Sequence, residues 1–115
     1  MIVEDNFKMR RLLKSVVGDL AETICECGDG CEAFETYVRH LPDWVLMDIE
    51  MRRMDGLAAS HQIVAAYPHA NICVVTCYGD AAMRAAAQRA GARAYVLKEH
   101  LYDLRAVISA TPRPT

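Results

Sequence analysis

The feature that most constrains the fold is a regular alternation of short apolar runs with helical patterns. We predict five strands on these runs: Met1–Val3, Thr23–Cys27, Trp44–Met47, Ile72–Val75 and Ala94–Leu97. Between the runs, apolar residues recur at spacings of three and four, which predicts amphipathic helices. Strands that alternate with helices form a parallel sheet with helices on both faces, because parallel neighbours need crossover connections. The sequence therefore predicts an α/β domain.

Length and charge exclude several classes of protein. The chain has 115 residues, a length typical of one domain with its own core. Its formal net charge is −2, whereas binding to nucleic acid phosphates requires a clear basic surplus. No apolar run approaches the ~20 residues of a membrane span, and no secretory signal is visible. We therefore expect a cytoplasmic domain that neither enters a membrane nor binds nucleic acid directly.

The cysteines point to reduced thiols. There are five of them, at positions 25, 27, 31, 73 and 77. An odd number without an export signal is typical of reduced cytosolic thiols. A metal site built from Cys25, Cys27 and Cys31 would lack a fourth ligand and a recognisable spacing. We therefore interpret the buried cysteines as small apolar residues.

Polar residues that follow the apolar runs indicate a common site. These residues are Glu4, Asp5, Asp48, Thr76 and Lys98. The carboxyl ends of parallel strands lie along one edge of the sheet, and ligand sites in open α/β sheets form there. A single polar residue after a strand is usually only solvated. Five of them at the same edge predict a site.

The residue types at this edge suit phosphoryl transfer. Crowded carboxylates repel each other, and Mg²⁺, which prefers oxygen ligands and keeps several waters, relieves that repulsion. A carboxylate can also act as a nucleophile and form an aspartyl phosphate. If Asp48 attacks a phosphoryl group, Mg²⁺, the Lys98 ammonium and the Thr76 hydroxyl would stabilise its equatorial oxygens.

Several segments carry a family resemblance. They are Val3–Asn6, Val45–Met51, Met54–Gly56, Val75–Asp80 and Gly91–Lys98. In this order and spacing they are specific, and on them the chain resembles the receiver domain of two-component response regulators over essentially its whole length. The resemblance implies a flavodoxin-like, CheY-like three-layer sandwich with strand order 2-1-3-4-5. We assign residues 1–110 to the receiver domain and residues 111–115 to a C-terminal tail or the start of a linker.

The resemblance assigns roles to the acidic residues. It makes Asp48 the phosphoacceptor. It implies that Asp5, Asp48 and the backbone carbonyl of Glu50 bind Mg²⁺ directly, and that Glu4 does so through water. The domain would catalyse only its own phosphorylation and slow autodephosphorylation, so we do not expect an enzyme with an external substrate.

The resemblance also implies a switch. Lys98 and Thr76 would bind the phosphoryl group, and Thr76 would move towards it. Tyr95 would change rotamer together with Thr76, which gives a two-state element biased by phosphorylation. Without the resemblance, Tyr95 would be interpreted as a half-buried strand tyrosine. Cys77 stands where the family usually has a small residue, and we interpret it as filling space.

The implied partners are proteins. A sensor histidine kinase would meet the first helix, which exposes Lys8, Arg11 and Lys14. A homodimer would use the face of the fourth helix, fifth strand and last helix, or the face of the first and last helices. The Lys98-Glu99 pair is similar to the NarL-like subfamily, whose members usually carry a C-terminal helix-turn-helix, so we expect a role in transcription regulation.

Three departures from the family pattern leave alternatives open. The first apolar run is short, Arg52 stands where the family often has proline, and Glu99 stands where many members have a cis proline. A cis bond before a residue other than proline costs about 2.5–4 kcal/mol, so we expect a trans bond there.

Two other functions compete with the phosphorylated switch. The first is a degenerate receiver that binds partners independently of phosphorylation. The second is a phosphatase with Asp48 as nucleophile and Glu50 as acid–base group, for which the chain lacks room for a substrate cap.

Overall fold

The centre of the molecule is a parallel sheet, seen in a computed structural model that describes residues 1–51 and 53–110. Its strands are β1 (Ile2–Val3), β2 (Glu26–Cys27), β3 (Val45–Asp48), β4 (Ile72–Thr76) and β5 (Ala94–Leu97). The order across the sheet is β2-β1-β3-β4-β5, and every neighbouring pair is parallel. This order confirms the fold that the sequence predicts.

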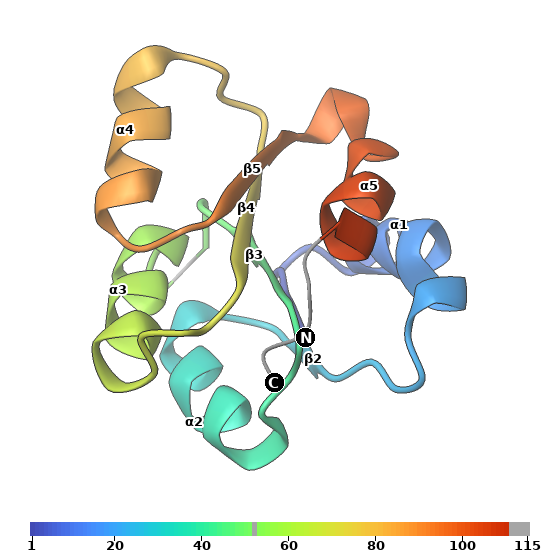
Figure 1. Cartoon of the computed structure of the whole chain (residues 1–115), viewed down its shortest axis with the longest axis horizontal. Coiled ribbons are helices and arrows are strands. Elements are labelled where there is room, and N and C mark those ends of the chain that lie inside the picture. The colour runs from blue at the N-terminus through green and yellow to red at the C-terminus, as the bar shows by residue number, and fades with distance from the viewer. Residues whose placement is uncertain (52, 111–115) are drawn as a thin grey trace.

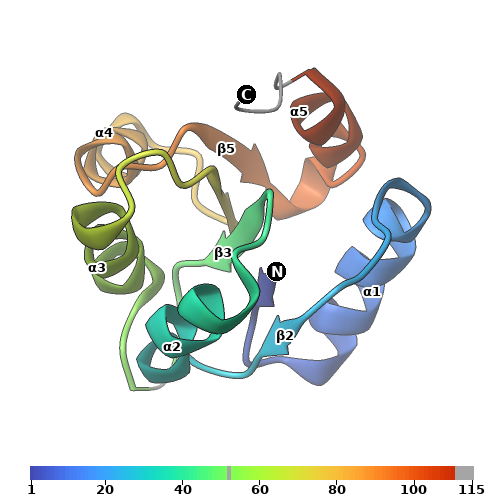
Figure 2. The same cartoon turned by 60° about the horizontal axis from the view of Figure 1, so that its bottom comes forward.

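Helices cover both faces of the sheet. They are α1 (Phe7–Val17), α2 (Gly30–His40), α3 (Gly56–Ala66), α4 (Ala81–Arg89) and α5 (Asp103–Ala110), with the short 3-10 turns η1 (Gly18–Leu20) and η2 (Lys98–His100). Figures 1 and 2 show α1 and α5 on one face and α2, α3 and α4 on the other. The result is a three-layer sandwich.

Apolar residues of the central strands are divided between the two faces. Val45 and Met47 belong to the core cluster under α2 and α3, while Leu46 belongs to the cluster under α1 and α5. Successive residues of a strand point to opposite faces, so a strand covered on both sides needs apolar residues throughout. This explains why the central strands read as continuous apolar runs.

Asparagine or aspartate side chains cap the N-termini of four helices. Asn6, Asp29, Asp55 and Asp80 each accept a hydrogen bond from the backbone N–H three residues later, at 2.8 to 3.1 Å. Each cap satisfies one of the backbone donors that a helix leaves unpaired at its start. Because these helices begin after strands end, their N-termini lie towards the carboxyl edge of the sheet.

Four strands differ from their predicted bounds; β1 begins one residue later and β4 ends one residue later than expected, and the larger differences are at β2 and β3. The expected strand Thr23–Cys27 is only Glu26–Cys27, because this edge strand pairs with β1 alone and β1 has just two residues. The third strand begins and ends one residue later than expected, so Asp48 lies inside β3 and pairs with Val75. The phosphoacceptor candidate is therefore held by the sheet itself.

The remaining expectations concern the loops and the ends of the chain. No cis peptide bond occurs within the described residues, which confirms the trans bond before Glu99. Arg52 and residues 111–115 lie outside the described residues. No described helix is long and apolar enough to cross a membrane.

Candidate metal and phosphoacceptor site

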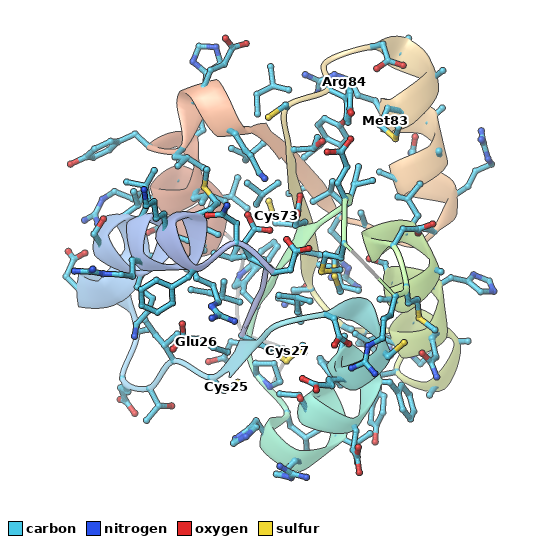
Figure 3. All side chains as sticks on the ribbon, turned by 180° about the vertical axis from the view of Figure 1, so that it is seen from behind. Cys25, Glu26, Cys27, Cys73, Met83 and Arg84 are labelled. Carbon is cyan, nitrogen blue, oxygen red and sulfur yellow. The ribbon has the colours of Figure 1, made fainter. Side chains whose placement is uncertain are left out.

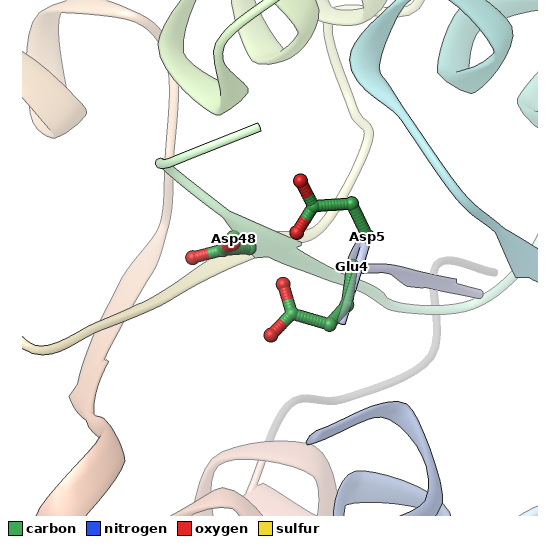
Figure 4. A group of neighbouring side chains, drawn as sticks. All are labelled: Glu4, Asp5 and Asp48. Atoms are coloured by element: carbon green, nitrogen blue, oxygen red, sulfur yellow. The ribbon is translucent and has the colours of Figure 1, made fainter. Parts of the chain in front are cut away.

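Three carboxylates meet at the carboxyl ends of β1 and β3. Glu4 and Asp5 follow β1, and Asp48 ends the neighbouring strand β3. One carboxylate oxygen from each residue lies within 4.8 Å of the other two, and Figure 4 shows the three side chains together. Glu4 and Asp48 are only 1% and 5% exposed. The predicted acidic cluster is therefore present and mostly buried.

Lys98 supplies the opposite charge. Its Nζ donates to Glu4 Oε1 at 3.2 Å and lies 3.3 Å from Asp48 Oδ1. The lysine follows β5, which is separated from β3 by β4, and its long side chain spans that distance. One ammonium therefore faces two buried carboxylates, which leaves the cluster with excess negative charge.

The pKa values of both Glu4 and Lys98 are raised, in part by this excess negative charge. Burial raises the pKa of Glu4 to about 8, and the hydrogen bond and negative charge of Asp48 act in the same direction. Burial alone would lower the pKa of Lys98, but the nearby Asp48 and Glu4 carboxylates hold it above its ordinary value. Glu4 therefore retains a proton near neutral pH when no cation is bound.

The donors present fit a divalent metal ion. Oε2 of Glu4 is buried and has no hydrogen-bond partner. A buried acceptor without a partner is costly, and a metal ion or a water bound to it would satisfy this oxygen. All the candidate side-chain ligands are carboxylate oxygens, the donors that Mg²⁺ prefers. The cluster is thus chemically suited to Mg²⁺.

Thr76 and Tyr95 are linked through a residue that the sequence analysis did not single out. The Thr76 hydroxyl accepts the backbone N–H of Tyr78 at 3.2 Å, and Thr76 is 1% exposed. The Tyr95 hydroxyl donates to the backbone carbonyl of Tyr78. The Arg84 guanidinium lies 4.6 Å from the centre of the Tyr95 ring. Both predicted switch residues therefore contact Tyr78.

Tyr78 also reaches Glu50. Its hydroxyl donates to Glu50 Oε1, which joins the loops that follow β4 and β3. In the sheet Asp48 pairs with Val75, so the segments that follow β3 and β4 begin side by side. The Glu50 side chain therefore contacts Tyr78 and is not one of the three carboxylates of the acidic cluster.

The cysteines do not form a metal cluster. Figure 3 shows Cys73 in the middle of the molecule, away from Cys25 and Cys27. Among the described residues, the one group of potential ligands close enough to hold an ion is the acidic cluster. Burial raises the pKa of Cys73 to about 12, so this thiol acts as an apolar core residue.

Comparison with known proteins decides the family. Residues 1–109 match the family model of the response regulator receiver domain. The chain belongs to this family. The receiver domain is 36% identical over 104 residues to chemotaxis protein CheY of Listeria monocytogenes. The match covers 90% of this chain and 87% of that protein. It is 37% identical to the transcriptional regulatory protein PdtaR of Mycobacterium tuberculosis, covering 85% of this chain and 48% of PdtaR.

Solved structures agree with this assignment. The receiver domain superposes on the response regulator domain of Thermotoga maritima CheB with a TM-score of 0.85 and 27% identity. The match covers 95% of this chain and 91% of that domain. Receiver domains of two-component systems generally use Mg²⁺ at an acidic pocket and interact with histidine kinases, and this chain has an acidic cluster of three carboxylates.

Proposed function

We propose that this receiver domain accepts a phosphoryl group on Asp48 from a phosphohistidine of a sensor histidine kinase or from a small acyl phosphate. The observation that supports this most is the setting of Asp48. Its carboxylate is 6% exposed, lies 3.3 Å from the Lys98 ammonium and belongs to the cluster with Glu4 and Asp5. A nucleophilic carboxylate needs such a setting, because charge on the incoming group must be stabilised.

The transfer step follows from the groups present. An Asp48 carboxylate oxygen forms a bond to phosphorus while the donor's bond from phosphorus to nitrogen or oxygen breaks, and the leaving group keeps that electron pair. Lys98 stabilises one equatorial oxygen of the transferred group. The Thr76 hydroxyl, which accepts the N–H of Tyr78 on its oxygen, still has its own proton to donate to another.

Mg²⁺ would be held by Asp5, Asp48 and the Glu50 carbonyl, with Glu4 acting through water. When bound, the ion supplies positive charge to a phosphoryl oxygen and offsets the repulsion among the carboxylates. Asp5 is well placed for a direct contact because it is the most exposed of the three acids. The domain modifies itself and hydrolyses its own aspartyl phosphate slowly, so it does not turn over an external substrate.

The switch would run through Tyr78. Thr76 moves towards the phosphoryl group, and Tyr78 passes the movement to Tyr95, because it contacts both residues. The rotamer of Tyr95 changes the surface formed by α4, β5 and α5, where a partner or a second copy would bind. The surface of α1 and α5 is the other candidate for a homodimer.

The regulated process would be transcription. The chain is 37% identical to PdtaR, which is named a transcriptional regulatory protein, and spans about half of its length. The alternative is a receiver that binds partners without phosphorylation. The two-residue β1 supports this alternative, because a short central strand weakens the support of Glu4 and Asp5.

The phosphoacceptor is tested by treating the purified chain with acetyl phosphate and Mg²⁺ and measuring its intact mass. We expect a gain of one phosphoryl group that disappears in Asp48→Asn. Asp80→Asn is the matched control, because asparagine caps a helix as well as aspartate does, and it should gain the group normally. A wild-type chain that gains nothing, or an Asp48→Asn chain that still gains it, would rule the proposal out.

Partner binding separates the two functions. If phosphorylation controls the output, binding of the partner or dimerisation should change on phosphorylation and should not respond in Asp48→Asn. Equal binding by the untreated, phosphorylated and Asp48→Asn forms would favour the phosphorylation-independent module.

A further inference from the structure

A second set of polar contacts joins the connection between β3 and α3 to the start of α2. Arg53 Nε donates to Asp29 Oδ2 at 3.1 Å, and its Nη2 donates to the same oxygen. The other oxygen of Asp29 accepts the backbone N–H of Glu32 at 3.1 Å and so caps α2. Asp29 therefore holds the helix start and the arginine at the same time.

The backbone makes a close contact at the same place. A Cβ on Gly30 would lie 2.0 Å from the carbonyl oxygen of Met54, so glycine lets the two backbones touch. Met54 also packs against the core cluster under α2 and α3. The connection after β3 is thus fastened to α2 by an ion pair at Arg53 and by packing at the next residue.

We propose that Asp29 and Arg53 are positioning residues for Mg²⁺ binding. The inference rests on the proposed function, in which the Glu50 carbonyl, three positions before Arg53, binds the ion. A connection that is fixed on α2 presents this carbonyl in a restricted range of positions. A released connection must be ordered again each time the ion binds, which weakens affinity.

The expected effect is modest because the arginine side chain is 61% exposed. Exposed ion pairs contribute little to the stability of the contact that they form. Loss of this pair should therefore change the dissociation constant of Mg²⁺ by only about two- to fivefold. The direction of the change is more informative than its size. Removing a positive charge near an acidic site strengthens cation binding by electrostatics alone, whereas releasing the connection weakens it.

Substitutions at Arg53 and Asp29 separate the effect of charge on Mg²⁺ affinity from the effect of releasing the connection. Arg53→Gln should weaken Mg²⁺ binding if Arg53 positions the connection and strengthen it if only its charge matters. Asp29→Asn keeps the cap and removes the charged partner, so it should weaken binding by a similar factor. The double variant should match Arg53→Gln, because that variant already removes every contact between Arg53 and Asp29, and the contact of Arg53 with Glu32 as well. Arg39→Gln removes a charge from the other end of α2 and should leave affinity unchanged or slightly stronger.

The experiment is calorimetric titration of each full chain with MgCl₂, with the melting temperature of the metal-free chain as a second measurement. We expect weaker affinity without a matching fall in melting temperature, and partial recovery in Arg53→Lys. Equal or tighter binding by Arg53→Gln would overturn the inference and leave the proposed function intact. A wild-type chain that binds no Mg²⁺ would overturn the inference and the proposed Mg²⁺ site together, whereas the phosphoacceptor role of Asp48 is tested separately by intact mass.

Discussion

The two ends of the neighbouring strands β3 and β4 lie in different environments. At the amino end, Val45 of β3 and Ile72 of β4 are fully buried among apolar side chains. At the carboxyl end, Asp48 and Thr76 are also buried, and Asp48 lies beside the charged side chain of Lys98. Burial of apolar surface stabilises the fold, whereas burial of charge costs free energy that one lysine offsets only in part. Stability and reactivity therefore belong to opposite parts of the same strands.

The largest effect is expected from a cavity at the buried amino end of β4. Ile72→Ala should lower the free energy of unfolding by about 2–5 kcal/mol, because it removes a fully buried side chain. Urea unfolding measures this loss. Ile72→Val is the milder control and should lose about 0.5–1.5 kcal/mol with Mg²⁺ affinity unchanged. An alanine variant as stable as the wild type would contradict the assignment of stability to this region.

Gly56→Ala should affect both regions. A Cβ at Gly56 would lie 1.8 Å from the carbonyl oxygen of Asp48, so the end of β3 must move. We expect a loss of about 1–3 kcal/mol in urea unfolding, as for other overpacked sites, together with slower phosphorylation by acetyl phosphate. Gly18→Ala is the matched control, because its Cβ would meet nothing within 4 Å. Equal effects of the two variants would refute the close contact.

Glu4, at the carboxyl edge of the sheet, should make the stability of the metal-free protein depend on pH. Its pKa is raised from 4.5 to about 8 in the fold, so the folded chain binds more protons than the unfolded chain between these values. The metal-free protein should therefore lose stability as pH rises through this window. Glu4→Gln, which carries no titrating proton, should make urea unfolding less dependent on pH. A wild-type stability that rises from pH 4.5 to 8 would show that burial does not govern this carboxyl.

Labelling of the native cysteines compares the buried strand β4 with the surface and needs no substitution. Cys31 and Cys77 are exposed, so the expectation that Cys77 fills space is wrong. Cys73 is buried, and burial raises its pKa to about 12. Iodoacetamide should therefore label Cys31 and Cys77 in the native protein and Cys73 only after unfolding, as peptide mass mapping would show. Native labelling of Cys73 at a comparable rate would mean that β4 opens readily.

The sequence predicts the sheet and the acidic cluster because both depend on local pattern. Apolar runs predict the strands, and parallel pairing then brings Glu4, Asp48 and Lys98 to one edge whatever the loops do. The length of β2 was not predictable from its own residues, since pairing with the short β1 determines where its ladder ends.

Contacts between loops are less predictable. The bonds from Tyr78 to Glu50 and from Arg53 to Asp29 join residues 28 and 24 positions apart. An exposed tyrosine or arginine in a sequence is usually interpreted as solvated, and nothing in its neighbours reveals a distant partner. Such contacts require the loop backbones to be known first.

The spread of the site along the chain has a consequence for biosynthesis. Lys98 lies 94 positions after Glu4, and its ammonium completes the pocket. While the ribosome is still making the last strand, the acidic residues have emerged without their cation. Until Lys98 has been added, a growing chain therefore lacks the ammonium that faces the Glu4 and Asp48 carboxylates in the folded protein.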